Sequence, residues 1–187
     1  MGMISILCHG TRIKKTVSFN TQIRNQILRI QILHALCTDE DINKPLVHPI
    51  GYPDDQEAPL LRIAGNDHLT DIVALLLHAG ADITQVSNDV FTRSNALFIA
   101  SAEGAYENLK KFLNFLDEYK HQQMSDILKQ PNHIMLQSPL HGAVQRGHYR
   151  CVKLLLRAHA CPNDKDRFGA TPLHVCASNL SLSLGQA

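Results

Sequence analysis

Apolar residues between Ser138 and Leu156 recur with helical spacing on both sides of a glycine, Gly147. Two stripes have the i, i+3, i+4 spacing of a buried helix face: Leu140, Ala143 and Val144 before the glycine, and Val152, Leu155 and Leu156 after it. Pro139 suits the first position of a helix, where its missing N–H would have no partner in any case, and Gly147 permits a tight reversal. The pattern predicts two short antiparallel helices, over 139–146 and 150–157. Helices of this length are not stable alone and need neighbours that cover their apolar faces.

The same pattern occurs in three other stretches of the chain: residues 58–77, 95–113 and 171–177. Their short motifs resemble the consensus of the ankyrin-repeat family, a unit of about 33 residues that opens with T-P-L-H. The sequence DRFGATPLH at 166–174 is similar to the start of that unit, and AGADI at 79–83 is similar to its end. The resemblance covers residues 51–177. It implies an all-α ankyrin-repeat solenoid, in which helix-turn-helix units with short hairpin-like fingers stack behind an N-terminal helical cap.

The resemblance divides the chain into three parts: a basic N-terminal arm at 1–19, a capping helix or degenerate repeat at 20–50, and the repeats at 51–187. The repeat units cover about 58–84, 95–131, 138–164 and, incompletely, 171–187. The second unit contains an insert at 117–131, where Met124, Ile127 and Leu128 predict an extra helical turn. A tolerated loop and a dedicated binding element are both compatible with this insert.

The two ends of the repeat array depart from the family pattern. The helix expected at 20–37 has apolar residues on two faces: Ile23, Ile27, Ile30 and His34 on one, and Leu28, Ile32, Ala35 and Leu36 on the other. We expect the arm and the first repeat to cover them. After Ala177 the chain has no second-helix pattern and no polar closing unit, which indicates a fragment of a longer protein, a frayed tail or a partner that covers this end.

Charge is unevenly distributed, although the whole chain has a net charge of only +1. Residues 1–50 sum to +3 and residues 51–100 to −5, so an acidic region follows the basic arm. A net charge near zero argues against a general nucleic-acid binder. The arm, with Arg12, Lys14 and Lys15, is either a solvated terminus or a site for phosphate or anionic lipid.

The location of the protein is inferred from its cysteines and from its apolar runs. The five cysteines are an odd number without paired spacing. This predicts free thiols in a reducing compartment, with Cys151 and Cys176 buried. No run reaches the ~18 apolar residues of a membrane span, and no signal peptide is recognisable. We therefore expect a cytoplasmic protein, or one in a host cytosol if it is a secreted effector.

No residue pattern predicts catalysis, a cofactor or a metal. His141 and His174 occupy the T-P-L-H position, where the resemblance implies a structural hydrogen bond, and neither H-E-x-x-H nor C-x-x-C occurs. No G-x-S-x-G motif or phosphate loop occurs, and the adjacent Cys8 and His9 do not form a nucleophile arrangement. We expect no enzymatic activity, no cofactor, no metal site and no small-molecule substrate.

The resemblance implies one functional surface, the concave groove lined by the loop tips between repeats and by the exposed side of each first helix. Carried over position by position, the tips are Asp54, Asp55 and Glu57; Asp89, Phe91, Thr92 and Ser94; Asn132, Ile134, Met135 and Gln137; and Lys165, Arg167 and Phe168. The corresponding helix positions are Asn66, Ala102, Glu103, Gln145 and Arg146. Large apolar tips are typical of interface anchors, unless they tuck between neighbouring fingers. Acidic tips at one end and basic tips at the other predict a partner of opposite polarity.

We therefore predict a non-enzymatic intracellular protein–protein interaction module that binds an unidentified protein partner in the concave groove of an ankyrin solenoid. The alternative is the targeting or substrate-binding part of a larger multidomain enzyme, or of a bacterial effector that acts on host proteins. The length of the complete gene would distinguish the two.

Overall fold

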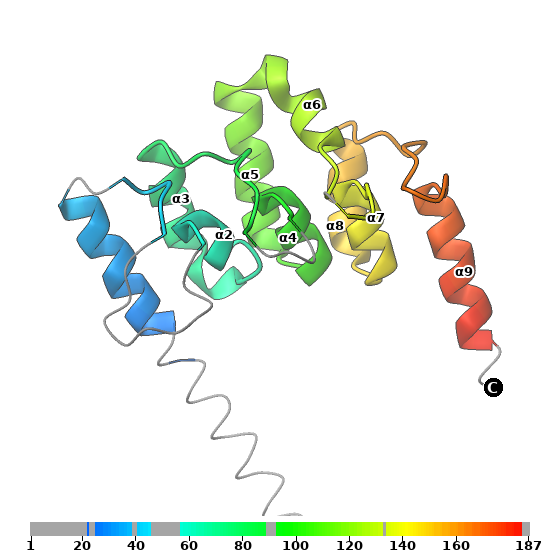
Figure 1. Ribbon diagram of the computed structural model, residues 1–187, viewed down its shortest axis with the longest axis horizontal. Coiled ribbons are helices and arrows are strands. Elements are labelled where there is room, and N and C mark those ends of the chain that lie inside the picture. Colours follow the sequence, from blue (N-terminus) through cyan, green and yellow to red (C-terminus); the bar gives the residue numbers. More distant parts are fainter. Residues whose placement is uncertain are drawn as a thin grey trace, which may run out of the picture.

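The described part of the chain is a row of short helices stacked in sequence order (Figure 1). The computed structural model describes residues 22, 25–38, 41–45, 57–88, 93–132 and 134–184. The expected arm at 1–19 lies outside these ranges. The first helix covers residues 25–37. The later helices are α2 (Pro59–Ile63), α3 (Thr70–His78), α4 (Ala96–Glu103), α5 (Tyr106–Tyr119), α6 (Met124–Lys129), α7 (Pro139–Gln145), α8 (Tyr149–Arg157) and α9 (Pro172–Leu184).

Successive helices form contacting pairs, α2 with α3, α4 with α5 and α7 with α8, and α9 packs against α7. The predicted all-α solenoid is confirmed. Within the described residues the extended structure is limited to one isolated bridge, between Val86 and Asn95, at the base of a finger. A backbone hydrogen bond of 2.9 Å from Ser87 to Ser94 closes the same finger.

The α7–α8 pair shows how local sequence sets the helix ends. Ser138 and His141 form a reciprocal cap in front of α7, and Pro139 takes the first helical turn. Gly147 reverses the chain with a φ of +73°, which favours glycine. The predicted helices at 139–146 and 150–157 are confirmed to within one residue.

Small residues allow neighbouring first helices to approach closely. A Cβ added to Gly142 of α7 would lie 3.3 Å from the ring of Phe98 and 3.4 Å from the Cβ of Ala102, both on α4. Behind this contact the core is mainly aliphatic and continuous from the first helix to α8. Leu97, Leu109 and Leu155 are fully buried in it.

The first helix buries only one of its two apolar faces. Ile32 and Ala35 are buried, whereas Ile27 is 40% exposed and Ile30 66% exposed. The described residues of the first repeat leave these two side chains uncovered, and the arm that was also expected to cover them lies outside the described ranges. The helix is held to the α2–α3 pair by an ion pair between Arg29 and Asp71 and by a 2.9 Å hydrogen bond between Asn25 and Asn66.

The last helix is longer than the sequence pattern indicated. α9 continues past Ala177 to Leu184 as one helix of 13 residues, where we had expected the repeat to stop or fray. The residues after Ala177 are serine, leucine and asparagine, with no proline or glycine before Gly185 to stop a helix.

Replacing Gly104 by alanine is predicted to destabilise the stack more than replacing Gly147. Both glycines have a φ of +73°, but a Cβ at Gly104 would lie 2.5 Å from the His148 ring of the next pair, whereas nothing lies within 4 Å at Gly147. Gly147→Ala should cost about 1 kcal/mol for its backbone conformation alone. Gly104→Ala should cost about 1–2 kcal/mol more, because the ring must be displaced. Urea unfolding measures the difference, and equal losses would contradict the close contact.

Candidate functional site

The finger at residues 166–170 is held in shape by its own aspartate. The Asp166 carboxylate accepts hydrogen bonds from the backbone N–H groups of Phe168 and Ala170, each at 2.9 Å. The backbones of Asp166 and Ala170 are bonded at 2.9 Å, and Gly169 takes a φ of +77°. The tip residue Phe168 is 77% exposed although the backbone that carries it is ordered by these bonds.

The preceding finger reaches the same shape with different residues. The Asn132 side chain accepts hydrogen bonds from the backbone N–H groups of Met135 and Gln137, each at 3.1 Å. Leu136, three residues before α7, has a φ of +53° at the position that Gly169 holds three residues before α9. A leucine in this region costs on the order of 1 kcal/mol relative to glycine. The surrounding hydrogen bonds therefore impose this backbone shape.

Two hydrogen bonds tie these fingers together. The backbone N–H of Arg167 donates to the carbonyl oxygen of Met135 at 2.8 Å. His141, fully buried, accepts the N–H of Ser138 at Nδ1 (3.2 Å), so its proton is on Nε2, which donates to the carbonyl oxygen of Ala170 at 3.1 Å. The structural role expected for the T-P-L-H histidine is therefore seen at His141.

The finger side chains divide into exposed and partly covered ones. Met135 is 41% exposed, and Lys165 and Arg167 are also exposed, whereas Ile134 and Gln137 are half-buried. The apolar tips were expected either to be exposed or to pack between neighbouring fingers. Phe168 and Met135 are exposed, and Ile134 is partly buried. At the other end Glu57 is half-buried. Ser94 and Asn132 were also expected as exposed tips, but both are buried, because their polar groups hold the fingers together. The other expected tips lie outside the described residues: Asp54, Asp55, Asp89, Phe91 and Thr92.

The helix positions of the expected groove differ in exposure, and Asn66 is half-buried with its side chain bonded to Asn25. Arg146 lies 3.7 Å from Glu103, and these two exposed side chains join the α4 and α7 ends of neighbouring pairs. Gln145 is exposed, and its carbonyl oxygen accepts a 3.1 Å hydrogen bond from Asn179. Ala102 is only 8% exposed and packs toward Gly142, so it is not available to a partner.

A family model of ankyrin repeats, in three copies, matches residues 97–184. These residues are ankyrin repeats. Ankyrin repeats are generally protein–protein interaction modules and are typically not catalytic. The fold alone does not identify what this chain binds.

Two known proteins match short parts of the chain. The Transient receptor potential cation channel subfamily A member 1 homolog of Caenorhabditis elegans is 52% identical over 40 residues, which are 21% of this chain and 3% of that protein. The Ankyrin repeat and ELMO domain-containing protein D of Dictyostelium discoideum is 37% identical over 73 residues, 37% of this chain and 6% of that protein. The chain thus matches only a small fraction of the length of each relative.

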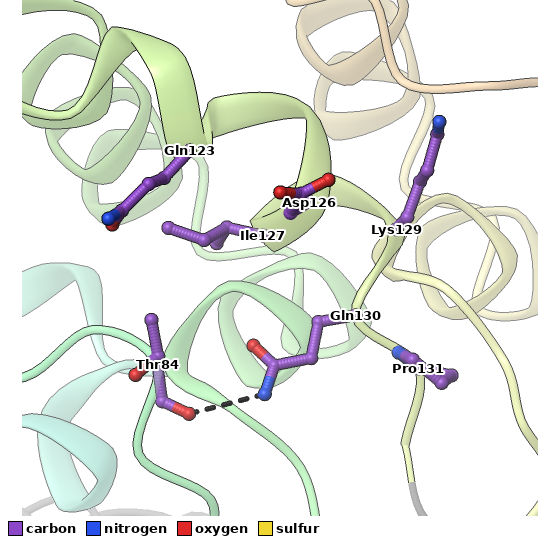
Figure 2. A pocket seen from close by; sticks show the side chains of 7 residues that line it. All are labelled: Thr84, Gln123, Asp126, Ile127, Lys129, Gln130 and Pro131. Carbon is purple, nitrogen blue, oxygen red and sulfur yellow. Dashed lines mark hydrogen bonds between the residues drawn. The ribbon is translucent and has the colours of Figure 1, made fainter.

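The insert in the second ankyrin repeat is a packed element. α5 extends to Tyr119, a 3-10 turn follows at His121–Gln123, and α6 places Ile127 and Leu128 in the core at 4% and 2% exposure. The predicted extra helical turn is confirmed. Gln130 then links the insert to the preceding finger, because its side chain donates to the Thr84 carbonyl oxygen at 3.3 Å (Figure 2). The same side chain accepts a hydrogen bond from Asn95 at 3.0 Å.

A depression of about 580 Å³ lies between this insert and the finger that contains Thr84 (Figure 2). Its lining mixes single charges with polar and apolar groups: Thr84, Gln123, Asp126, Ile127, Lys129, Gln130 and Pro131. Such a surface has no dominant chemistry. Sequence reasoning missed it, since it depends on how α6 folds back over the repeat.

The described residues show no grouping of three or more His, Cys, Asp or Glu side chains that would hold a metal. Nor does any helix among them combine the length and apolarity needed to cross a lipid bilayer. The thiols differ from expectation: Cys151 is buried, but Cys176 and Cys37 are exposed. Cys176 had been expected inside by analogy with the inner alanines of complete repeats, and this expectation was wrong because its face of α9 has no covering helix among the described residues.

His141→Ala is predicted to destabilise the protein far more than His174→Ala. The first change leaves the Ser138 N–H and the Ala170 carbonyl without their buried partner, at a cost of about 2–4 kcal/mol. His174 makes the corresponding bonds to Thr171 but is exposed, so its loss should cost about 0.5–1 kcal/mol. Chemical denaturation of both variants measures this, and equal losses would show that the bridge to Ala170 is unimportant.

Cys37 and Cys176 should be alkylated in the native protein long before Cys151. Burial, and then the negative charge of Asp67, raise the pKa of the Cys151 thiol, so its reactive thiolate form becomes rarer as well as inaccessible. Timed iodoacetamide labelling followed by peptide mass spectrometry tests this order. Labelling of Cys151 at the rate of Cys176 would mean that α8 opens readily.

Proposed function

We propose that this chain is a non-enzymatic interaction module that binds a protein partner through its fingers and the concave ends of α4 and α7. The partner contacts would come from Met135, Gln137, Lys165, Arg167 and Phe168 on the fingers and from Gln145 and Arg146 on α7. Ile134 is half-buried in the finger. The acidic tips at the other end extend this surface in the proposal.

The combination of exposed anchors and ordered backbone supports this proposal. Phe168 and Met135 are large and exposed, and each is carried by a backbone that an Asp or Asn side chain fixes. An anchor that is already positioned loses little conformational freedom on binding, which favours affinity. Aromatic residues are also enriched among the residues that dominate binding energy.

Exposed cations beside the anchors suggest the polarity of the partner. Lys165 and Arg167 both precede Phe168 in the last described finger, and both are exposed. A partner with a carboxylate next to an apolar residue would match this end. Such complementarity acts mainly on orientation and association rate.

The alternative is that these repeats are the targeting part of a larger protein. The share of the relatives that the chain matches, 3% and 6%, supports this alternative, because both relatives contain much more than the matched repeats. The same groove would then select a substrate or a location for another domain. Sequencing the complete transcript distinguishes the two.

We also place the protein in the cytoplasm. Cys37 and Cys176 are free and exposed, which is typical of proteins in a reducing compartment. A secreted effector in a host cytosol would meet the same conditions.

Removing the two exposed anchors is predicted to abolish partner capture. The intact chain and a Met135→Ala, Phe168→Ala variant would be used as bait in eukaryotic cytosol, with bound proteins quantified by mass spectrometry. The matched control is Leu75→Ala, Leu173→Ala, which removes two other exposed apolar side chains, 48% and 75% exposed, from α3 and α9. We expect a protein that is retained by the intact chain and the control and reduced at least about tenfold with the finger variant.

The thermal unfolding midpoint of each bait shows that it is folded. A partner retained equally by all three baits would refute the finger assignment and leave the depression beside α6 or the basic arm as the binding element.

A further inference from the structure

The chain contains an unusually one-sided charge distribution around α8. Between Asp126 and Asp164 there is no aspartate or glutamate, while five lysines and arginines occur: Lys129, Arg146, Arg150, Lys153 and Arg157. Three of these are on α8 at i, i+3 and i+7. This spacing aligns them along one edge of the helix over about 10 Å.

These three cations line a groove between the second helices of two neighbouring repeats. The groove has a volume of about 260 Å³ and is lined by Tyr106 of α5 and by Tyr149, Arg150, Lys153, Leu154 and Arg157 of α8. It therefore differs from the proposed concave site, which is built from fingers and first helices. No carboxylate is among its lining residues.

The cations of this groove remain available to a ligand. Among the described residues, no ion pair involves Arg150, Lys153 or Arg157. The guanidinium carbon of Arg150 lies 4.1 Å from the centre of the Tyr106 ring, a cation–π contact that orders the side chain without neutralising its charge. Tyr149 is 76% exposed at the other side, with its hydroxyl free to donate a hydrogen bond.

Two carboxylates at the start of α5 are not among the lining residues of the groove. Asp67 accepts hydrogen bonds from the backbone N–H groups of Glu107 and Asn108 at 3.3 and 3.0 Å, so its charge is directed to the start of α5. Glu107 is exposed in the first turn of α5, next to Tyr106, and is not a lining residue.

We propose that this basic–aromatic groove binds an acidic segment of a partner protein. Three aligned cations over about 10 Å match an extended peptide, in which carboxylates on alternate residues lie about 7 Å apart on one face. The tyrosine rings pack against the methylene groups of the acidic side chains of such a peptide. A nucleic acid would need a longer basic surface, since stable binding uses about 6–10 phosphate contacts. The inference is independent of the proposed finger site.

Binding of a defined acidic peptide tests the proposal. The probe is a fluorescein-labelled peptide of about twelve residues that alternates glutamate and serine. In the matched control peptide every glutamate is replaced by glutamine. Fluorescence anisotropy with the full chain should show saturable binding of the acidic peptide only. The variant Arg150→Gln, Lys153→Gln, Arg157→Gln should weaken that binding at least about tenfold.

A charge-matched variant separates the groove from net charge. Lys44→Gln, Lys120→Gln, Lys129→Gln removes the same number of cations from outside both proposed sites, and should change the affinity less than about twofold. In 15N NMR spectra the acidic peptide should shift the amides of α8 and the start of α5. If the triple α8 variant does not fold, Lys153→Gln with Arg157→Gln replaces it, since neither side chain contacts Tyr106 through a described cation–π pair.

Several results would overturn the proposal. Equal losses for the two charge-matched variants would mean non-specific attraction. An absence of saturable binding at millimolar peptide, or NMR shifts confined to the fingers, would also contradict it. Tighter binding of a DNA duplex or of phosphatidylserine vesicles, lost in the same α8 variant, would assign the groove to another class of ligand.

Discussion

Short helices leave most of the backbone N–H and C=O groups at their ends without hydrogen-bond partners, and the rest of this structure depends on how neighbouring repeats supply those partners. α2 has only five residues, and the carbonyl groups after its last turn have no helical partners. Asn108, fully buried at the start of α5, donates its side-chain amide to the carbonyl oxygens of Ile63, Ala64 and Asn66 at 3.0–3.1 Å. In return, Asp67 caps the start of α5. Each repeat is therefore completed by the next, and its stability is conditional on that neighbour.

The same constraint explains why the fingers are ordered. His141 caps its own helix with Nδ1 and bonds the following finger with Nε2, so one buried ring joins two repeats. The finger it holds is in turn bonded to its predecessor through Arg167 and Met135. Flexible loops would lose conformational entropy on binding a partner. These fingers are already ordered in the free protein by hydrogen bonds that also hold the repeats together. Exposed anchors such as Phe168 are thus placed by the requirements of the fold.

The sequence allowed α7 and α8 to be predicted to within one residue, because Pro139, Gly147 and the apolar stripes all agree on the same local structure. It did not show that Ile30 is exposed, since periodicity identifies an apolar face but not whether another segment covers it. Leu136 gave no signal of its left-handed backbone, because that conformation is imposed by Asn132. The groove at Arg150 depends on the distance between α5 and α8, which a single sequence does not contain. Local rules thus predicted the repeats, while the surfaces depended on contacts between them.

Both proposed surfaces cross boundaries between repeats. The fingers join the third and fourth units through Arg167 and Met135, and the basic–aromatic groove joins the second and third through Arg150 and Tyr106. In a stack whose units are stable only together, a ligand that holds two neighbours stabilises the junction it spans. The gain in stability extends to repeats that the ligand does not contact, because each junction between repeats stabilises the next. Binding at either surface should therefore favour the folded array as a whole, and the two sites need no direct contact to reinforce each other.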